Sequence, residues 1–223
     1  MSIFIIAEAG VNHNGDDALA FQLVDAAIEA GADAVKFQTF KAENLVTKTA
    51  GKSNYQKQQT DADESQFAML KKLELSHDSH KKLINYCKIK KIQFLSTAFD
   101  LESLEFLVKE LELDMLKVPS GEITNGPLLL AHAKTGCNLI VSTGMATMKE
   151  VEVALGVIAF GLLGFDEISQ LAFQQAYYSE AGKKVLKEKV TLLHCTTEYP
   201  AAIEDINLHA INSMRNSFGL KVG

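Results

Sequence analysis

The sequence has few cysteines, and their spacing gives them no joint role. Its 223 residues include three, Cys87, Cys137 and Cys195, which lie far apart, are odd in number and never form a CxxC pair. This pattern argues against a disulfide framework and against a cysteine zinc cluster. It is typical of a protein that works in a reducing cytoplasm.

Long runs of one residue type are missing as well. There is no long Lys/Arg run and the formal net charge is −6, which argues against a nucleic-acid partner and an anionic membrane surface. The N-terminal apolar run Ile3-Phe4-Ile5-Ile6 is too short to span a membrane, and no basic leader precedes it. We therefore expect a soluble, cytoplasmic protein. If its substrate is an anion, local lysines must bind it against the global charge.

What is present is a regular alternation of strand-like and helix-like segments. Hydrophobic residues make up 47% of the chain, enough for the core of one large or two small domains. The periodicity predicts strands at residues 3–9, 33–40, 92–97, 115–119, 138–143 and 190–195, and the start of a seventh at 220–223. It predicts helices at residues 16–30, 77–90, 101–111, 127–136, 148–163 and 206–218.

Two stretches do not fit this alternation. The polar residues 41–64 are too many for a simple connection and suggest a functional excursion or lid. Residues 164–188 lengthen another connection; their portion 172–182 has helical character, but no chemical purpose is evident in them.

Alternating strands and helices of this length imply parallel strands with helical crossovers. Either a closed (β/α)₈ barrel or an open doubly wound sheet is built in this way. Polar residues recur at the C-terminal end of nearly every predicted strand, and a barrel gathers all those ends around one mouth. An open nucleotide-binding sheet would favour a G-x-G-x-x-G motif after its first strand. This sequence has no such motif there. We predict an α/β fold, a (β/α)₈ TIM barrel that is incomplete in residues 1–223, with about six βα units and the start of strand seven.

Two lysines stand inside predicted strands. In the second strand, Lys36 and Gln38 share one face, while Val35 and Phe37 share the other. A lysine in this setting is costly unless it is paired or reaches an open mouth, although a snorkelling surface lysine is the simpler alternative. Lys117 stands in the same situation in the fourth strand.

The run Lys117-Val118-Pro119-Ser120-Gly121-Glu122 turns out of that fourth strand. Gly121 lets backbone N–H groups approach a ligand, Ser120 offers a hydroxyl and Lys117 a charge, which suits a phosphate or carboxylate. Glu122 beside them is a candidate general acid or base. The plainer interpretation is an ordinary turn with an exposed glutamate. Ser142-Thr143-Gly144 closes the next strand similarly, before a helix N-terminus that favours anions.

Other polar residues have weaker claims. Asn12-His13-Asn14-Gly15 is either turn chemistry or a set of side chains beside Glu8 that recognises sugar hydroxyls. His77 and His80 have the i, i+3 spacing of a metal pair, but their charged neighbours favour a solvated helix face. A Cys195–His194 dyad is disfavoured because adjacent strand residues point to opposite faces, so His194 or Thr196 pointing inward is preferred.

Taken in order, the motifs resemble the sialic acid synthase family, which comprises the N-acetylneuraminate synthases and their legionaminic acid relatives. The matching stretches, spread over nearly the whole chain, are Ile6 to Gly15, Val35 to Thr39, Phe94 to Thr97, Lys117 to Glu122, Ser142 to Met145 and Leu192 to Pro200. The resemblance implies a transferase that condenses phosphoenolpyruvate with an N-acetylated hexosamine, such as N-acetylmannosamine, to form a nonulosonic acid and phosphate by C–O cleavage.

The resemblance also implies roles for individual residues. Seven would hold phosphoenolpyruvate: Lys36, Thr97, Lys117, Ser120, Gly121, Ser142 and Thr197, the last standing where some relatives have Asn. Glu8, Gln38 and Tyr199 would contact the sugar. Glu122 would be the acid/base group and, with Lys36 and Lys117, forms the predicted catalytic set.

A divalent metal, Mn²⁺ or Mg²⁺, polarises the sugar aldehyde in this family. Its ligands are two histidines, one in a Ser-Asp-His segment after strand seven and one at strand eight, and neither falls within a chain that stops at Gly223. The antifreeze-like C-terminal domain is absent too. We therefore expect no metal ligand among these residues, an inactive fragment, and a homodimer only for the full-length protein.

Two alternatives stay open at this stage. One is a Schiff-base aldolase that uses Lys36 or Lys117 as its nucleophile. The other is a non-catalytic fragment that binds a phosphorylated ligand or a partner protein.

Overall fold

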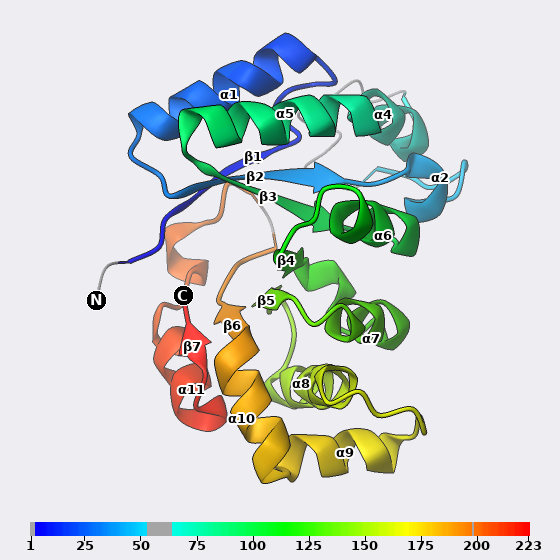
Figure 1. Cartoon of the computed structure of the whole chain (residues 1–223), viewed down its shortest axis with the longest axis vertical. Coiled ribbons are helices and arrows are strands. Elements are labelled where there is room, and N and C mark those ends of the chain that lie inside the picture. Colours follow the sequence, from blue (N-terminus) through cyan, green and yellow to red (C-terminus); the bar gives the residue numbers. More distant parts are fainter. Residues whose placement is uncertain (1–2, 53–63, 198) are drawn as a thin grey trace. The chain divides into compact units, whose positions relative to one another are not determined.

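The computed structural model describes residues 3–52, 64–197 and 199–223, and the chain divides into two compact units. The first, Met1–Leu113, contains β1 (Ile6–Gly10), α1 (Asp17–Glu29), β2 (Ala34–Thr39), α2 (Ala42–Leu45), α4 (Gln66–Lys72), α5 (His77–Lys90), β3 (Gln93–Ala98) and α6 (Leu101–Lys109) (Figure 1). The second, Asp114–Gly223, contains β4 (Met115–Val118), the 3-10 turn η1 (Ser120–Glu122), α7 (Gly126–Lys134), β5 (Asn138–Ser142), α8 (Met148–Leu162), α9 (Gln170–Tyr178), α10 (Glu180–Lys189), β6 (Val190–Leu193), the 3-10 turn η2 (Ile203–Asp205), α11 (His209–Phe218) and β7 (Lys221–Val222).

In the first unit, β1, β2 and β3 pair in parallel and in chain order. The register places Lys36 opposite Glu8 and Gln38 opposite Thr97, so these four side chains share one face of the sheet. The other face is mainly apolar, with Val35, Phe37 and Phe94 all at most 5% exposed, and α1 and α5 lie side by side along this sheet (Figure 1). The predicted separation of polar and apolar faces in β2 is therefore confirmed.

In the second unit, β4 to β7 also pair in parallel and in chain order. Lys117 lies opposite Ile140, and Ser142 lies two residues further on the same face of β5. The opposite face includes five side chains that are at most 1% exposed: Leu116, Val118, Leu139, Val141 and Leu192. A sheet of parallel strands covered by helices has this composition.

Most predicted elements are present, with shifted ends. The strand predicted at 3–9 begins only at Ile6 because Ile3, Phe4 and Ile5 are exposed. The helix predicted at 206–218 begins at His209, after the turn η2. Helix α5 begins where predicted, and the hydroxyl of Ser76 accepts the Ser79 N–H as its cap.

The connection at residues 164–188 contains two helices where the sequence suggested one short helix. Ser179 ends α9 and also caps α10, where its hydroxyl accepts the Gly182 N–H at 2.9 Å. A Cβ on Gly182 would lie 1.8 Å from the carbonyl oxygen of Ala176, so only glycine permits this corner. Both helices contact α8 (Figure 1).

The expectation that His77 and His80 lie on a solvated helix face is wrong. His80 is fully buried, and the half-buried ring of His77 stacks on Phe106 with ring centroids 3.6 Å apart. The charged neighbours on α5 face solvent, whereas the His80 ring is buried and the His77 ring packs on Phe106.

Buried His80 joins a chain of hydrogen bonds within the first unit. Its Nδ1 donates to the Ser76 carbonyl at 2.9 Å, which leaves Nε2 to accept from Thr39 Oγ1 at 2.8 Å. Thr39 Oγ1 lies 2.7 Å from Ser96 Oγ, which donates to it. The pKa of His80 is lowered to about 4, mainly by burial and in smaller part by His77 and His13, against the opposing effect of the Ser76 hydrogen bond.

We expect this histidine to make the fold sensitive to acid. The folded-state pKa lies below the unfolded value of 6.5, so the unfolded chain takes up the proton first, and stability is lost as pH falls from 6.5 toward 4. The loss attributable to His80 is about 2–3 kcal/mol between about pH 7.5 and about pH 4.5. Urea unfolding at both values measures it. His80→Gln should show a smaller acid loss than the parent, whereas the exposed His209→Gln should match the parent; an unchanged acid loss in His80→Gln would contradict the assignment.

Candidate active site

Lys36 is 6% exposed in the middle of β2 and is paired on both sides. Its Nζ forms an ion pair with the Glu8 carboxylate and donates to Thr97 Oγ1 at 3.4 Å. β1, β2 and β3 each supply one member of this group. The Glu8 side chain is 54% exposed, so the group opens to solvent at the carboxylate. The interpretation of Lys36 as a snorkelling surface lysine is excluded.

Gly10 brings Gln38 into the same group. The pairing of β1 with β2 shifts between Glu8 and Gly10, and Gly10 has φ +54°. A Cβ there would lie 3.4 Å from Glu8 Oε1 and 3.6 Å from Gln38 Nε2, so both side chains flank the bare glycine backbone. Two of the three residues that the resemblance assigns to the sugar, Glu8 and Gln38, thus lie together.

The loop Asn12-His13-Asn14-Gly15 supports only part of its predicted role. Asn12 and Asn14 are exposed, but His13 is fully buried, with its ring 6.2 Å from that of Phe37. His13 Nδ1 accepts the Gly15 N–H at 2.9 Å, so Nε2 carries the proton and lies buried with no partner in the part of the chain that the structure describes. Burial lowers the pKa of His13. A sugar-binding role for this histidine is therefore wrong.

In the second unit, the motif at 117–122 forms a compact cluster at the end of β4. Lys117 is 8% exposed on the strand, and Ser120, Gly121 and Glu122 form η1. Glu122 Oε2 accepts from Asn125 Nδ2 at 2.7 Å, and Asn125 Oδ1 accepts the Leu128 N–H as the cap of α7. Asn125 therefore couples the candidate acid/base group to the start of a helix. The sequence analysis missed this residue, although Asn before Gly-Pro is a recognisable N-cap signal.

A pocket of about 240 Å³ lies beside this cluster. Three of its lining residues belong to the predicted phosphoenolpyruvate set, namely Ser120, Gly121 and Thr197. The rest of its wall comprises Ile123, Thr124, Met145, Ala146 and Glu150. Ser142 is buried on the same sheet face as Lys117 and does not line the pocket. Tyr199, which follows β6, is 62% exposed.

No dyad forms between His194 and Cys195. The Nε2 of His194 donates to the Ile206 carbonyl at 2.6 Å, while Cys195 Sγ accepts the Gly144 N–H at 3.2 Å. The two side chains thus have different partners, as predicted, although β6 ends at Leu193 and both residues lie beyond the strand.

The predicted excursion at 41–64 is described only in part, because residues 53–63 lie outside the described residues. Its first turn is α2. Lys52 and Glu64, on either side of the gap, form an ion pair at 3.3 Å.

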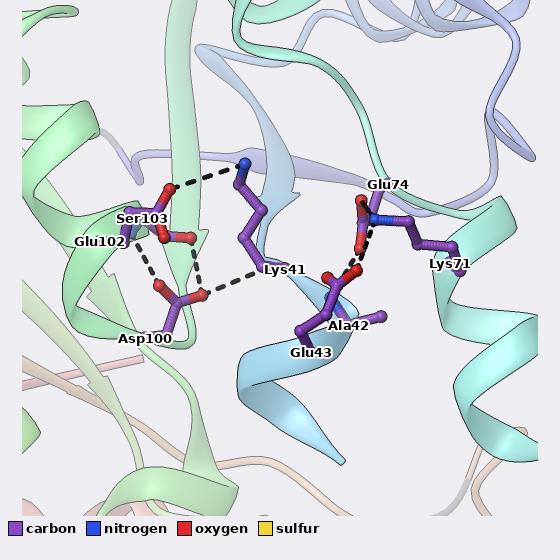
Figure 2. Close-up of polar contacts among 8 residues, drawn as sticks. All are labelled: Lys41, Ala42, Glu43, Lys71, Glu74, Asp100, Glu102 and Ser103. Atoms are coloured by element: carbon purple, nitrogen blue, oxygen red, sulfur yellow. Dashed lines mark hydrogen bonds and ion pairs between the residues drawn. The ribbon is translucent and has the colours of Figure 1, made fainter. Parts of the chain in front are cut away.

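Carboxylates fix the entry to α2 from two sides (Figure 2). Glu74 Oε1 accepts the Ala42 N–H at 2.6 Å, and its other oxygen lies 3.0 Å from Lys71 Nζ. On the other side, Asp100 Oδ2 accepts the Lys41 N–H at 3.3 Å. These bonds hold backbone N–H groups at the start of a helix, where no helical partner exists for them.

Residues 23–223 match the model of the NeuB family. The chain belongs to the NeuB family.

Two curated relatives of this NeuB-family chain are N,N′-diacetyllegionaminic acid synthases. That of Campylobacter jejuni subsp. jejuni serotype O:2 is 48% identical over 219 residues, covering 98% of this chain and 59% of the relative. That of Legionella pneumophila subsp. pneumophila is 46% identical over 223 residues, covering 100% of this chain and 57% of the relative. The chain thus spans less than two thirds of the length of these relatives.

Solved structures confirm the fold class. The N-acetylneuraminic acid synthetase of Leptospira borgpetersenii, solved with citrate, superimposes with TM-score 0.74 at 30% identity, covering 100% of this chain and 64% of that one. A truncated 3-deoxy-D-arabino-heptulosonate 7-phosphate synthase from Thermotoga maritima shares the fold alone, with TM-score 0.56 at 12% identity. The prediction of an α/β barrel fold that is incomplete in this chain is confirmed.

The described residues of this NeuB-family chain do not fit the metal that the resemblance implies. Among residues 3–52, 64–197 and 199–223, no three His, Cys, Asp or Glu side chains are placed to share an ion. Mn²⁺ and Mg²⁺ need several oxygen or imidazole donors together, whereas Glu8 and Glu122 are engaged with Lys36 and Asn125. Within the same ranges, no helix has both the length and the apolar character needed to cross a bilayer.

Proposed function

We propose that this chain carries much of the substrate-binding machinery of a sialic-acid-type synthase, which condenses phosphoenolpyruvate with an N-acetylated hexosamine. The supporting observation is a buried lysine on a polar strand face in each unit, Lys36 and Lys117, in a chain of the NeuB family. Lysine side chains on such strand faces suit a small dianion. The names of the two relatives make N,N′-diacetyllegionaminic acid the first product to test.

The proposed division of roles is the one that the family resemblance implies. Lys36 and Thr97 in the first unit, and Lys117, Ser120, Gly121, Ser142 and Thr197 in the second, bind phosphoenolpyruvate by charge, hydroxyls and backbone N–H groups. Glu8 and Gln38, which flank Gly10, bind sugar hydroxyls together with Tyr199.

The proposed reaction joins the C3 carbon of phosphoenolpyruvate to the aldehyde carbon of the open-chain sugar. Water adds at C2, and phosphate leaves with the bridging oxygen. Glu122 is the proposed proton carrier, giving a proton to the aldehyde oxygen or taking one from the water. Asn125 orients it by holding Oε2 at 2.7 Å.

The Schiff-base alternative finds no support at Lys36. Its Nζ is already engaged by the Glu8 carboxylate and by Thr97 Oγ1. The cytoplasmic location, the homodimer and the Mn²⁺ or Mg²⁺ requirement remain proposals for the full-length protein.

Isotope labelling of the full-length protein's reaction tests the function. We expect phosphoenolpyruvate and a panel of N-acetylated hexosamines to give one nonulosonic acid and one phosphate per turnover, identified by mass spectrometry. In ¹⁸O-water the released phosphate should carry no label, because C–O cleavage leaves the original oxygen on phosphorus. Labelled phosphate would instead reveal P–O cleavage and contradict the proposed reaction; no nonulosonic acid with any sugar of the panel would overturn the function.

A further inference from the structure

Three residues from successive strand ends of the second unit lie together, with Gly144 next to both Ser120 and Cys195. Ser120 follows β4, Gly144 follows β5 and Cys195 follows β6. A Cβ on Gly144 would lie 2.6 Å from Ser120 Cβ, 2.7 Å from Ser120 Oγ and 3.9 Å from Cys195 Sγ. The first two distances are too short for contacts of a real Cβ atom. The Ser120 side chain can therefore occupy this place only because residue 144 has no side chain.

Hydrogen bonds fasten the Gly144 turn to the end of β6. The Gly144 N–H donates to Cys195 Sγ at 3.2 Å, and Gly144 has φ +49°, a conformation that favours glycine. The preceding Thr143 donates both its N–H and its hydroxyl to the Leu193 carbonyl, at 3.0 and 3.1 Å. The turn therefore has little freedom to move away from Ser120.

We propose that Gly144 and Cys195 are positioning residues that fix the Ser120 hydroxyl for the anionic ligand. This inference rests on the proposed function, because Ser120 and Gly121 are assigned there to phosphoenolpyruvate. Both line the pocket of about 240 Å³, and so does Thr197, two residues after Cys195. Cys195 thus acts through the Gly144 backbone, and Gly144 acts through its contact with Ser120.

The sulfur acceptor is tested by substitution in the full-length protein. Cys195→Ala leaves the Gly144 N–H without its acceptor, whereas Cys195→Ser keeps an acceptor at the same position. We expect the KM for phosphoenolpyruvate to rise about tenfold in Cys195→Ala and less in Cys195→Ser. The KM for the sugar and the melting temperature should stay near the parent values in both. Cys137→Ala, at the opposite end of β5, is the control.

The close approach of Gly144 to the Ser120 side chain is tested by Gly144→Ala. Gly164→Ala is its matched control, because Gly164 has φ +72° but no atom within 4 Å of an added Cβ. Both variants carry the backbone strain, and only Gly144→Ala overlaps Ser120. We expect the KM for phosphoenolpyruvate to rise about a hundredfold in Gly144→Ala and to stay unchanged in Gly164→Ala.

Calorimetry separates the failure of this inference from the failure of the function. If the parent does not bind phosphoenolpyruvate, both fail. If the parent binds it, and Ser120→Ala weakens binding while Cys195→Ala and Gly144→Ala bind as the parent does, the inference is overturned and the function stands. Equal losses for both substrates with a lower melting temperature in Cys195→Ala would indicate a purely structural role and would also overturn it.

Discussion

Replacing Lys117 by alanine should abolish phosphoenolpyruvate binding and leave the fold intact. Lys117 is 8% exposed on β4, directly before the turn that carries Ser120 and Gly121. Removing one partner of a buried charge pair costs about 3 kcal/mol, so the dissociation constant should rise about a hundredfold or more. Titration calorimetry measures the affinity, and circular dichroism and the melting temperature report the fold.

Two further variants make this result specific. Lys117→Met keeps the length of the aliphatic stem but removes the charge, so it should bind as weakly as Lys117→Ala while preserving the packing of β4. Lys184→Ala removes an exposed lysine of α10 in the same unit and should bind like the parent. Unchanged affinity in a folded Lys117→Met protein would reject the assignment of this lysine to the ligand.

Replacing Glu122 by glutamine should lower kcat without weakening phosphoenolpyruvate binding. Glutamine has the same shape and retains an oxygen that accepts from Asn125 Nδ2, but it cannot carry a proton at neutral pH. Loss of a general acid or base lowers rates by about 10²- to 10⁴-fold. Steady-state kinetics of the full-length protein give kcat, and calorimetry gives the affinity.

The control for Glu122→Gln is the same substitution at a glutamate of the same unit that lies away from the pocket. Glu188→Gln removes an exposed carboxylate near the end of α10 and should retain parental kcat. If Glu122→Gln turns over at the parental rate, the proton carrier is another group. A loss confined to phosphoenolpyruvate affinity would instead make Glu122 a binding residue.

The sequence predicts the strands and their polar faces well because both depend on local periodicity. A lysine between Val35 and Phe37 must face away from the apolar layer, and the register puts it beside Glu8 and Thr97. The grouping of Ser120 and Thr197 at one pocket follows in the same way, since C-terminal ends of neighbouring parallel strands lie together.

Features that depend on contacts distant in sequence were not predictable from periodicity. The burial of His80 on α5 depends on Thr39 of β2 and Ser96 of β3, which join its ring in one chain of hydrogen bonds. The approach of Gly144 to Ser120 is invisible in the common sequence Ser-Thr-Gly. The corner at Gly182 depends on a carbonyl six residues earlier, which neither helix propensity nor capping preference specifies.

The strict alternation of faces in β2 limits which genetic changes this chain tolerates. Substitution of a single β2 residue alters one side chain, but insertion or deletion of one residue before Lys36 would exchange the two faces along the whole strand. The ammonium group would then enter the layer beneath α1 and α5. Phe37 would replace it opposite Glu8 after a deletion, and Val35 would do so after an insertion. Among functional descendants of this sequence, the length of the segment between Gly31 and Phe40 should therefore vary less than the residues within it.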